Sequence, residues 1–264
     1  METRTARIAL SAWTLLVVFF LWTPLVLICV YAFNASNIQS WPIAGFTTKW
    51  FRSAWDNPEA RDALILSLKA AGLATAVALV LGTAAATAVT RFRFFGRDTI
   101  TFLLVLPIAL PGVVTGIALN SFFSNNPVHH LNPGLLTIVI GHATFCIVIV
   151  YNNVAARLRR TQTSLTEASM DLGADGWQTF RFVTLPVVST ALVAGSIFTF
   201  SLTLGDYITP SLVGNVDFIG NVIYRNVLGL TNNLPFAAAY ATVPLVVMGV
   251  YLALAKRLGA FEAL

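Results

Sequence analysis

Asp206 and Tyr207 form the pair of neighbouring residues whose chemistry stands out in this sequence. They lie in the stretch SLTLGDYITP, at the end of an apolar run that begins twenty residues earlier at Pro186. A carboxylate attracts a cation by its charge, and an aromatic ring adds a cation–π contact. The pair therefore fits a cationic ligand, and a hydrated carboxylate at an interface is the alternative. Asn120 and Ser121 are weaker candidates for the same polar surface.

The other residues that commonly carry chemistry are isolated from one another. His129 and His130 are adjacent with no third ligand nearby, so a metal site is not predicted. His142 stands alone in the stretch GHATF, where an ordinary hydrogen bond between helices is the expected role. Cys29 and Cys146 fall inside apolar runs and are interpreted as small buried hydrophobic side chains.

ATP binding by this chain is not expected either. Its three lysines are Lys49, Lys69 and Lys256, and none of them follows a glycine-rich phosphate-binding loop. No Ser/His/Asp arrangement for nucleophilic catalysis is recognisable in the sequence. We therefore predict that the chain is not an enzyme and binds no cofactor of its own.

The composition is that of a membrane protein. Apolar residues make up 57% of the 264 residues and charged residues only 10%, whereas a soluble domain has about 25% charged residues. The formal charge of +5 does not indicate nucleic-acid binding, because the arginines lie at the ends of apolar runs and not on one polar face.

Six segments are long and apolar enough to cross a bilayer, which takes about 20 residues. With no water in the bilayer core to bond to the backbone, all six are expected to be helices. The first run, residues 8–33, is too long for the ~7–15-residue apolar region of a signal peptide, so we expect it to be retained. We predict an all-α membrane protein with one transmembrane domain over residues 1–264 and helices at residues 8–33, 63–89, 99–123, 135–155, 186–205 and 236–255.

The distribution of lysine and arginine predicts the orientation in the membrane. Cytoplasmic connections carry an excess of both residues. One set of connections holds eleven of them, at positions 4, 7, 91, 93, 97, 157, 159, 160, 181, 256 and 257. The other set holds four, at positions 49, 52, 61 and 225. Both termini and the connection at residues 161–186 are therefore predicted to be cytoplasmic.

Two of the predicted spans have distinctive compositions. The second span is rich in glycine and alanine, which allow close helix approach, so it is expected to pack inside the bundle. The third span contains Pro107 and Pro111, each of which removes a backbone donor and clashes with the preceding turn. Such an interrupted helix either lines a transport pathway or is a simple packing kink.

The first outer connection, residues 34–62, is rich in tryptophan. Its stretch FTTKWFRSAWDN predicts a short helix capped at Thr47 or Thr48. The aromatic and basic residues, which include Trp41, Trp50 and Trp55, suit a helix that lies on the membrane surface. Contact with a docking protein is the alternative.

The connection at residues 161–186 is an unusually long polar interval between apolar segments, and we call it the docking segment. Ser164 and Glu167 fit a capping box that starts a short helix. The helix is predicted to end at Leu172, with Gly173 in the left-handed conformation that follows a helix. Asp175 is placed to cap a second short helix. Such a short helix needs a partner or a packed neighbour to be stable.

The docking segment resembles the EAA loop of permeases from binding-protein-dependent type I ABC importers. The resemblance rests on the string EASMDLGADGWQTFRFVTLP, which matches the family pattern of EAA, three residues, glycine, nine residues, isoleucine, one residue and LP. The differences from the pattern are Ser169 for alanine and Val183 for isoleucine, and both are mild. The strings FRFFGRDTITFLLVLPIALPGVVTGIAL and GHATFCIVIVYNNVAARLRR resemble permeases of spermidine/putrescine importers.

The resemblance implies a MetI-like permease fold in the bacterial cytoplasmic membrane and an ATP-driven transport function. It implies that the loop docks on an ATPase subunit through Glu167, Ala168, Ser169 and Gly173, and Leu172 is added because it shares the apolar face of that helix. The implied partners are a second permease of a different but homologous sequence, two ATPase subunits that bind ATP and magnesium, and an extracytoplasmic binding protein.

Polyamines are the substrates that the resemblance favours, because polyamine permeases of this type carry acids at or beside the position of Asp206. Related permeases serve iron, thiosulfate or phosphonates, and these substrates remain alternatives. A secondary transporter is the alternative from another class, and it predicts intramembrane ionisable pairs for ion coupling.

Overall fold

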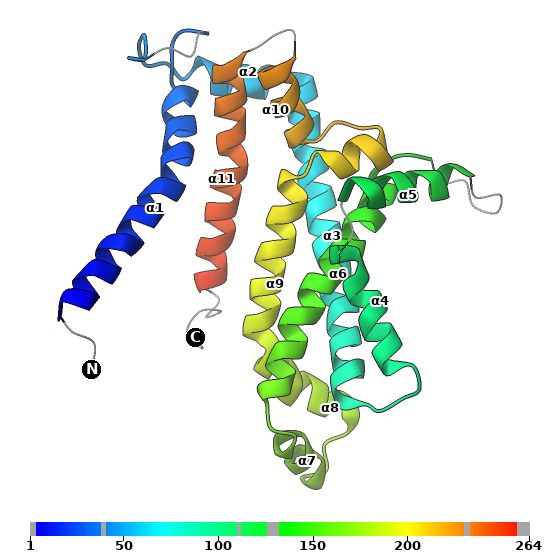
Figure 1. The fold of residues 1–264 in the computed structure, drawn as a ribbon. Helices are drawn as coiled ribbons and strands as arrows, with labels where there is room; N and C mark the ends of the chain where they lie inside the picture. The colour runs from blue at the N-terminus through cyan, green and yellow to red at the C-terminus, as the bar shows by residue number, and fades with distance from the viewer. Residues whose placement is uncertain (1–3, 38–40, 110–111, 126–131, 230–232, 258–264) are drawn as a thin grey trace. The chain divides into compact units, whose positions relative to one another are not determined.

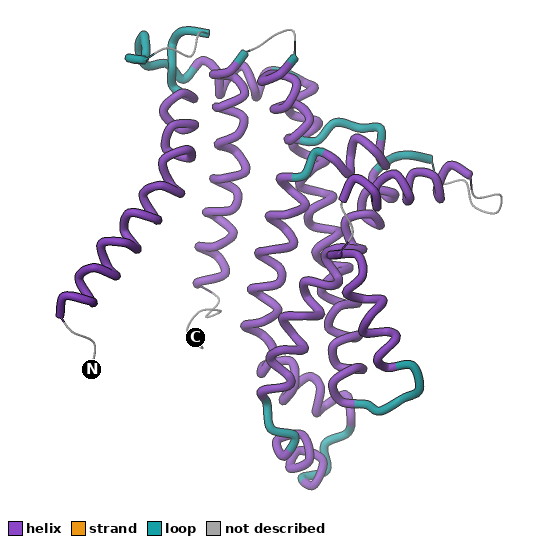
Figure 2. Tube along the Cα trace, in the orientation of Figure 1, coloured by secondary structure: helices purple, strands orange, loops and turns teal. Residues whose placement is uncertain are grey.

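The computed structural model describes residues 4–37, 41–109, 112–125, 132–229 and 233–257, and most of them are helical (Figures 1 and 2). The chain divides into two compact units, one formed by Met1–Arg61 with Val222–Val246 and the other by Asp62–Asn221 with Val247–Leu264. The division falls within helices α3, α10 and α11. The elements are α1 (Arg4–Ala32), α2 (Lys49–Asp56), α3 (Pro58–Arg91), α4 (Arg97–Ala109), α5 (Gly112–Asn125), α6 (Leu135–Arg160), α7 (Ser164–Asp171), α8 (Gly176–Thr179), η1 (Phe180–Thr184), α9 (Leu185–Gly205), η2 (Pro210–Gly214), α10 (Ile219–Leu228) and α11 (Leu234–Arg257).

Five stretches of helix are long and apolar enough to cross a membrane. They are α1, α3, α6, α11 and the stretch Gly176–Gly205, in which α8, η1 and α9 run on without a break. A sixth span results if α4 and α5 are counted together. The all-helical class and the membrane-spanning character predicted from the sequence are thus confirmed.

The third predicted span is not the continuous helix expected over residues 99–123. The chain forms α4 and α5 instead, and the two helices are bent by 104° relative to each other, so that α5 points away from the bundle (Figure 1). Pro107 lies inside α4, and Pro111 lies outside the described residues. The predicted interruption of this span is therefore confirmed. The bend is sharper than the simple packing kink that was one of its two interpretations.

The core of the second unit forms around α6. This helix packs against α9 and α4, and small residues of α3 approach it closely. Ala70, Ala74, Ala78 and Ala86 of α3 are fully buried, which confirms that the alanine-rich span lies inside a bundle. The residues that α6 contributes to this hydrophobic core are all buried, and they are Cys146, Val150, Tyr151, Val154, Ala155 and Leu158.

The first unit contains the predicted short helix α2. The Thr48 side chain makes no capping bond, whereas Thr47 Oγ1 accepts a hydrogen bond from the Lys49 backbone N–H at 3.2 Å. Trp50 is buried, and its Nε1 donates to the Asn34 carbonyl at 2.7 Å. Trp41 and Trp55 are exposed. The surface role of the tryptophans therefore rests on these two residues and not on Trp50.

Candidate functional site

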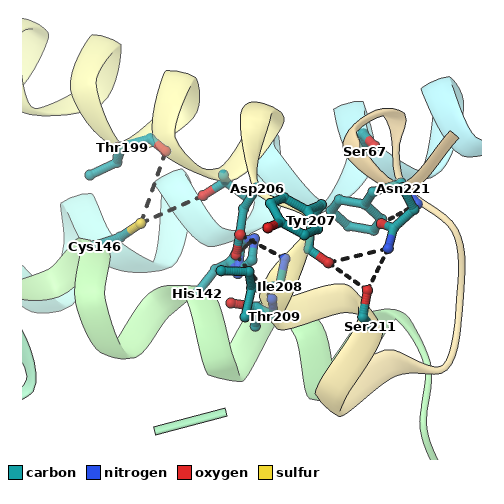
Figure 3. A network of polar contacts seen from close by, with 12 residues as sticks. Ser67, His142, Cys146, Thr199, Asp206, Tyr207, Ile208, Thr209, Ser211 and Asn221 are labelled. Carbon is teal, nitrogen blue, oxygen red and sulfur yellow. Dashed lines mark hydrogen bonds and ion pairs between the residues drawn. The ribbon is translucent and has the colours of Figure 1, made fainter. Parts of the chain in front are cut away.

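Asp206 ends one helix and begins the next. It is the C-terminal cap of α9, and its two carboxylate oxygens accept backbone N–H groups of the following turn. Oδ1 accepts from Ile208 at 2.9 Å, and Oδ2 accepts from Thr209 at 3.2 Å (Figure 3). Aspartate is favoured at such positions because a short carboxylate can bond to the free N–H groups of a new helix. The carboxylate is consequently held in one orientation while 25% of its side-chain surface stays exposed.

His142 lies on α6 directly beside this carboxylate. Its Nε2 is 3.8 Å from Asp206 Oδ2, and only 4% of the side chain is exposed. Its ring meets Phe218 edge to face, with 6.2 Å between the ring centroids. Nε2 is buried and has no hydrogen-bond partner among the described residues. The ordinary interhelical hydrogen bond expected for His142 is therefore wrong for this nitrogen, because Asp206 stops short of bonding distance.

Gly141 explains how these two residues meet. A Cβ placed on Gly141 would lie 3.1 Å from Thr209 Cγ2, which is closer than carbon atoms pack without strain. Glycine at this position of α6 therefore lets the segment after Asp206 lie against the helix. The same approach brings the Asp206 carboxylate to the next residue of α6, His142.

His142, Asp206 and Thr209 line a cavity of about 1030 Å³ in the second unit. Its walls are mostly apolar, as is usual for ligand sites. The polar side chains in the wall come mainly from α6 and α9 and from the turn after α9, and they include His142, Asn152, Asn153, Ser201, Thr203 and Asp206.

The residues predicted from sequence divide in two groups at this cavity. Asp206 and Tyr207 line it, and so do Pro107 and Gly112 from the broken third span. Asn120 and Ser121 are not among the described lining residues; they lie on α5, where they bond to Ser124 and Asn125 of their own helix. The sharp bend between α4 and α5 turns them away from the place that a straight span would have given them.

The sequence interpretation missed the contribution of α6 to this wall. His142, Cys146, Ile149 and Asn153 recur at the spacing of one helical face, and all four line the cavity. A stripe of polar and small residues on an otherwise apolar span was the signal that could have identified them. Cys146 Sγ lies 3.6 Å from Thr203 Oγ1 and thereby links α6 to α9.

The docking segment starts differently from its prediction. Thr163 occupies the N-cap position of α7, and Ser164 is the first helical residue. Thr163 already has helical backbone angles, and its carbonyl accepts the Glu167 N–H at 3.1 Å. The predicted capping box of Ser164 and Glu167 is therefore wrong, because the first turn begins one residue earlier without a side-chain cap.

The end of α7 confirms its prediction. Leu172 is the C-cap, and Gly173 has φ of +89°, in the region that glycine adopts without a steric penalty. The Gly173 N–H bonds to the Met170 carbonyl at 2.9 Å, and the Ala174 N–H bonds to the Ser169 carbonyl at 3.0 Å. These two bonds form a Schellman motif, which closes the helix and reverses the chain.

The second short helix also forms as predicted. Asp175 Oδ1 accepts the Gln178 N–H at 2.7 Å, and Gln178 Oε1 accepts the Asp175 N–H at 2.9 Å. This reciprocal capping box starts α8. Because α8 continues through η1 into α9, the docking segment leads directly into the helix that ends at Asp206.

A side-chain hydrogen bond holds α7 against α8. The hydroxyls of Ser169 and Thr179 are 2.9 Å apart, and Thr179 is buried. Ser169, which replaces an alanine of the family pattern, thus contacts another residue of its own chain. Glu167 and Ala168 point to solvent, and Leu172 and Trp177 are 90% and 67% exposed. The segment therefore presents an exposed apolar face, although such side chains are normally buried.

Membrane-spanning helices around a cavity are the architecture of a transport protein. Residues 78–260 match the model of a protein family described as "Binding-protein-dependent transport system inner membrane component". The chain belongs to this family.

Individual relatives are permease proteins of transport systems, which is the same class of protein. The chain is 35% identical over 199 residues to the putrescine transport system permease protein PotI of Escherichia coli (strain K12), covering 74% of this chain and 70% of that protein. It is 30% identical over 195 residues to the spermidine/putrescine transport system permease protein PotC of the same strain, covering 74% and 72%. It is also 54% identical over 112 residues to the inner membrane ABC transporter permease protein YdcU, covering 42% and 36%.

Solved structures confirm the permease fold. A bacterial ABC transporter that imports the acidic polysaccharide alginate matches with a TM-score of 0.71 at 18% identity, covering 96% of each chain. The MetNI methionine ABC transporter matches with a TM-score of 0.58 at 17% identity, covering 78% of this chain and 93% of that one. The relatives are permease subunits, so the chain is a membrane component of an ABC importer and not an enzyme. This membership also argues against a secondary transporter.

Proposed function

We propose that this chain is a permease subunit of an ABC importer for polyamines such as putrescine and spermidine. The observation that carries the proposal is the carboxylate of Asp206 in the cavity wall, beside Tyr207. Asp206 is the one carboxylate among the described residues that line this cavity. An ammonium group in an apolar cavity needs such a negative partner. Two of the curated relatives are polyamine permeases by name, which supports the same substrate class.

The chemistry of the cavity wall favours a polyamine over the alternative substrates. Thiosulfate and phosphonates are anions, and a partly buried carboxylate would repel them in a medium of low dielectric constant. Iron needs several hard or imidazole ligands that converge on one point. Asp206 and His142 are the two acidic or imidazole side chains in the described cavity wall. A polyamine has an ammonium group that can pair with Asp206 and methylene groups that suit the apolar wall, and its further ammonium groups need partners outside this described wall.

We also propose that the docking segment transmits force from an ATPase subunit. The exposed apolar face formed by Leu165, Leu172 and Trp177 is suited to a groove on another protein. The excess of basic residues in its set of connections supports a cytoplasmic location. The complete assembly would contain a second permease, two ATPases that hold ATP and magnesium, and an extracytoplasmic binding protein.

One continuous helical stretch gives the proposed transmission its mechanical route. The stretch Gly176–Gly205 has 30 residues, and at ~1.5 Å per residue it is about 45 Å long. The docking segment lies at one end and Asp206 at the other. Closure of the ATPases around ATP would draw the docking segments together and tilt these helices, which changes access to the cavity. Different contacts of the docking segment with the two ATPase states would supply the driving energy.

The substrate proposal is tested with Asp206→Asn in the assembled transporter. Asparagine is also a good helix cap, so the fold is expected to persist while the charge is lost. Uptake of radiolabelled putrescine by proteoliposomes should fall about tenfold, because a charge-assisted bond is lost. Asp98→Asn removes an exposed carboxylate at the start of α4 and serves as the control. Unchanged uptake by an intact Asp206→Asn complex contradicts the substrate proposal.

The coupling proposal is tested with Gly173→Asp. A carboxylate at the C-terminal end of α7 opposes the helix dipole and places a charge beside the apolar docking face. Co-purification of the ATPase with the membrane subunits should fall about tenfold, since each ~1.4 kcal/mol of lost affinity is tenfold. Gly173→Asn is the matched control, because asparagine tolerates positive φ and carries no charge. A wild-type yield of ATPase with Gly173→Asp would refute the proposed contact.

A further inference from the structure

His142 is buried in the cavity wall with one ring nitrogen unused. Its side chain is 4% exposed, and Nε2 has no hydrogen-bond partner among the described residues. Buried polar atoms are nearly always bonded, so an unpaired one needs an explanation. The nearby Asp206 Oδ2, at 3.8 Å, is too far for a direct hydrogen bond. The nitrogen and the carboxylate oxygen thus lie side by side at a distance longer than a hydrogen bond (Figure 3).

The surroundings show which kind of group would fit between them. Asp206 already accepts two backbone N–H groups, but each carboxylate oxygen has further lone pairs. A neutral imidazole with its proton on Nδ1 offers Nε2 as an acceptor. A group that donates two hydrogen bonds fits between these two acceptors, and the charge of the Asp206 carboxylate favours a cationic one.

We propose that His142 Nε2 and Asp206 Oδ2 together bind one ammonium group of the substrate. An ammonium nitrogen has three N–H donors and can lie about 2.9 Å from each of two acceptors at this separation. Asp206 supplies the charge, and His142 supplies a second acceptor without placing a second carboxylate in the apolar wall, where it would be costly. The inference rests on the proposed function. It adds His142 as the residue that selects an ammonium group with free N–H donors.

The rest of the wall suits the remainder of such a molecule. Phe145 and Ile149 of α6 and Phe198 and Leu202 of α9 line the same cavity. The methylene groups between the ammonium centres of a polyamine would lie against these side chains and remove apolar surface from water. The His142–Asp206 pair then binds one ammonium end of the polyamine.

The test compares His142→Leu with His142→Gln in the complete transporter, reconstituted with its ATPases, partner permease and binding protein. Leucine removes the acceptor, whereas the side-chain oxygen of glutamine can replace Nε2. Initial uptake of putrescine should fall about tenfold for His142→Leu and should return to within about threefold of wild type for His142→Gln. Thr144→Val is the control on the same helix, because the Thr144 hydroxyl bonds to the Ile140 carbonyl of its own helix at 2.9 Å.

The double variant His142→Leu/Asp206→Asn separates a shared ligand from a structural role. If both side chains hold one ammonium, the double variant should lose about as much uptake as one single variant, because coupled residues are not additive. Multiplied losses would overturn the inference. So would wild-type or higher uptake by His142→Leu, which would make the imidazole a competing counter-ion of Asp206. A wild-type complex that takes up no polyamine would instead remove the proposed function itself.

Discussion

The docking segment and the cavity are built in opposite ways. In the docking segment, the turn between the two short helices is formed by hydrogen bonds between residues a few positions apart in the chain. The Schellman motif at Gly173 and the capping box at Asp175 both fit within about one helical turn. In the cavity, the decisive contact joins His142 of α6 to Asp206 at the end of α9, and only packing of the two helices brings them together.

This difference matches the roles that we propose for the two regions. A surface that must be recognised by another protein gains from being preformed, because less conformational entropy is lost on binding. A site that must open and close gains from residues on separate helices, because a small helix movement changes their distance. Disturbing helix packing should therefore damage the cavity and spare the docking segment, whereas removing a local cap should do the reverse.

The largest effect is expected from Gly141→Leu, which forces a bulky side chain against Thr209. Overpacking of this kind typically costs about 1–3 kcal/mol, and it would separate His142 from Asp206. Putrescine uptake should fall by more than about tenfold, and the thermal unfolding temperature of the purified complex should drop. The ATPase should still co-purify, because the bonds within the docking segment do not depend on this contact.

Gly141→Ala is a milder form of the same substitution. A Cβ at this position meets Thr209 Cγ2 at 3.1 Å, so a small shift can relieve the contact and a smaller loss of uptake is expected. If Gly141→Leu transported at the wild-type rate, close packing at this point would not be what assembles the cavity. If it lost the ATPase as well, the two regions would not be independent in the way that their contacts indicate.

A smaller effect is expected from Asp175→Ala, which removes the capping box of α8. Loss of such a cap costs about 1 kcal/mol, so ATPase activity stimulated by the binding protein should fall about threefold to fivefold. The KM for putrescine should stay unchanged, because the cavity is untouched. Asp175→Asn keeps a side-chain oxygen for the Gln178 N–H and is the control. A raised KM with normal ATPase stimulation would contradict the separation of the two regions.

Sequence reasoning succeeded where the structure is decided locally. Gly173 and Asp175 were identified because a helix end needs a residue with positive φ and a new helix needs a side-chain cap. The start of α7 was placed one residue late, since Thr163 enters the helix without the side-chain bond that a capping box requires. Helix boundaries of this kind vary by a residue or two whenever the cap is not used.

Sequence reasoning was less successful for features that depend on contact between segments far apart in the chain. Asn120 and Ser121 were named as weaker candidates for the surface around Asp206, but the 104° bend between α4 and α5 places them on a separate helix, and they are not among the described residues that line the cavity. His142 was given a routine hydrogen bond, because a single sequence does not show that Asp206 would stop 3.8 Å away. Asp206 lines the cavity and its contact with a cation stays a prediction, whereas its role as a helix cap was not anticipated.

The sequence by itself determined the membrane class, five of the helical spans and the chain reversal at Gly173, and its resemblance to ABC importer permeases indicated the family. The class, the spans and the reversal follow from apolar run length or from interactions between residues close in the chain. Tertiary structure alone decided which face of α6 lines the cavity and that an unpaired imidazole lies beside the carboxylate of Asp206. The physical reason is that these features depend on how α6 packs against α9 and against the segment after Asp206, and no short stretch of sequence encodes that packing.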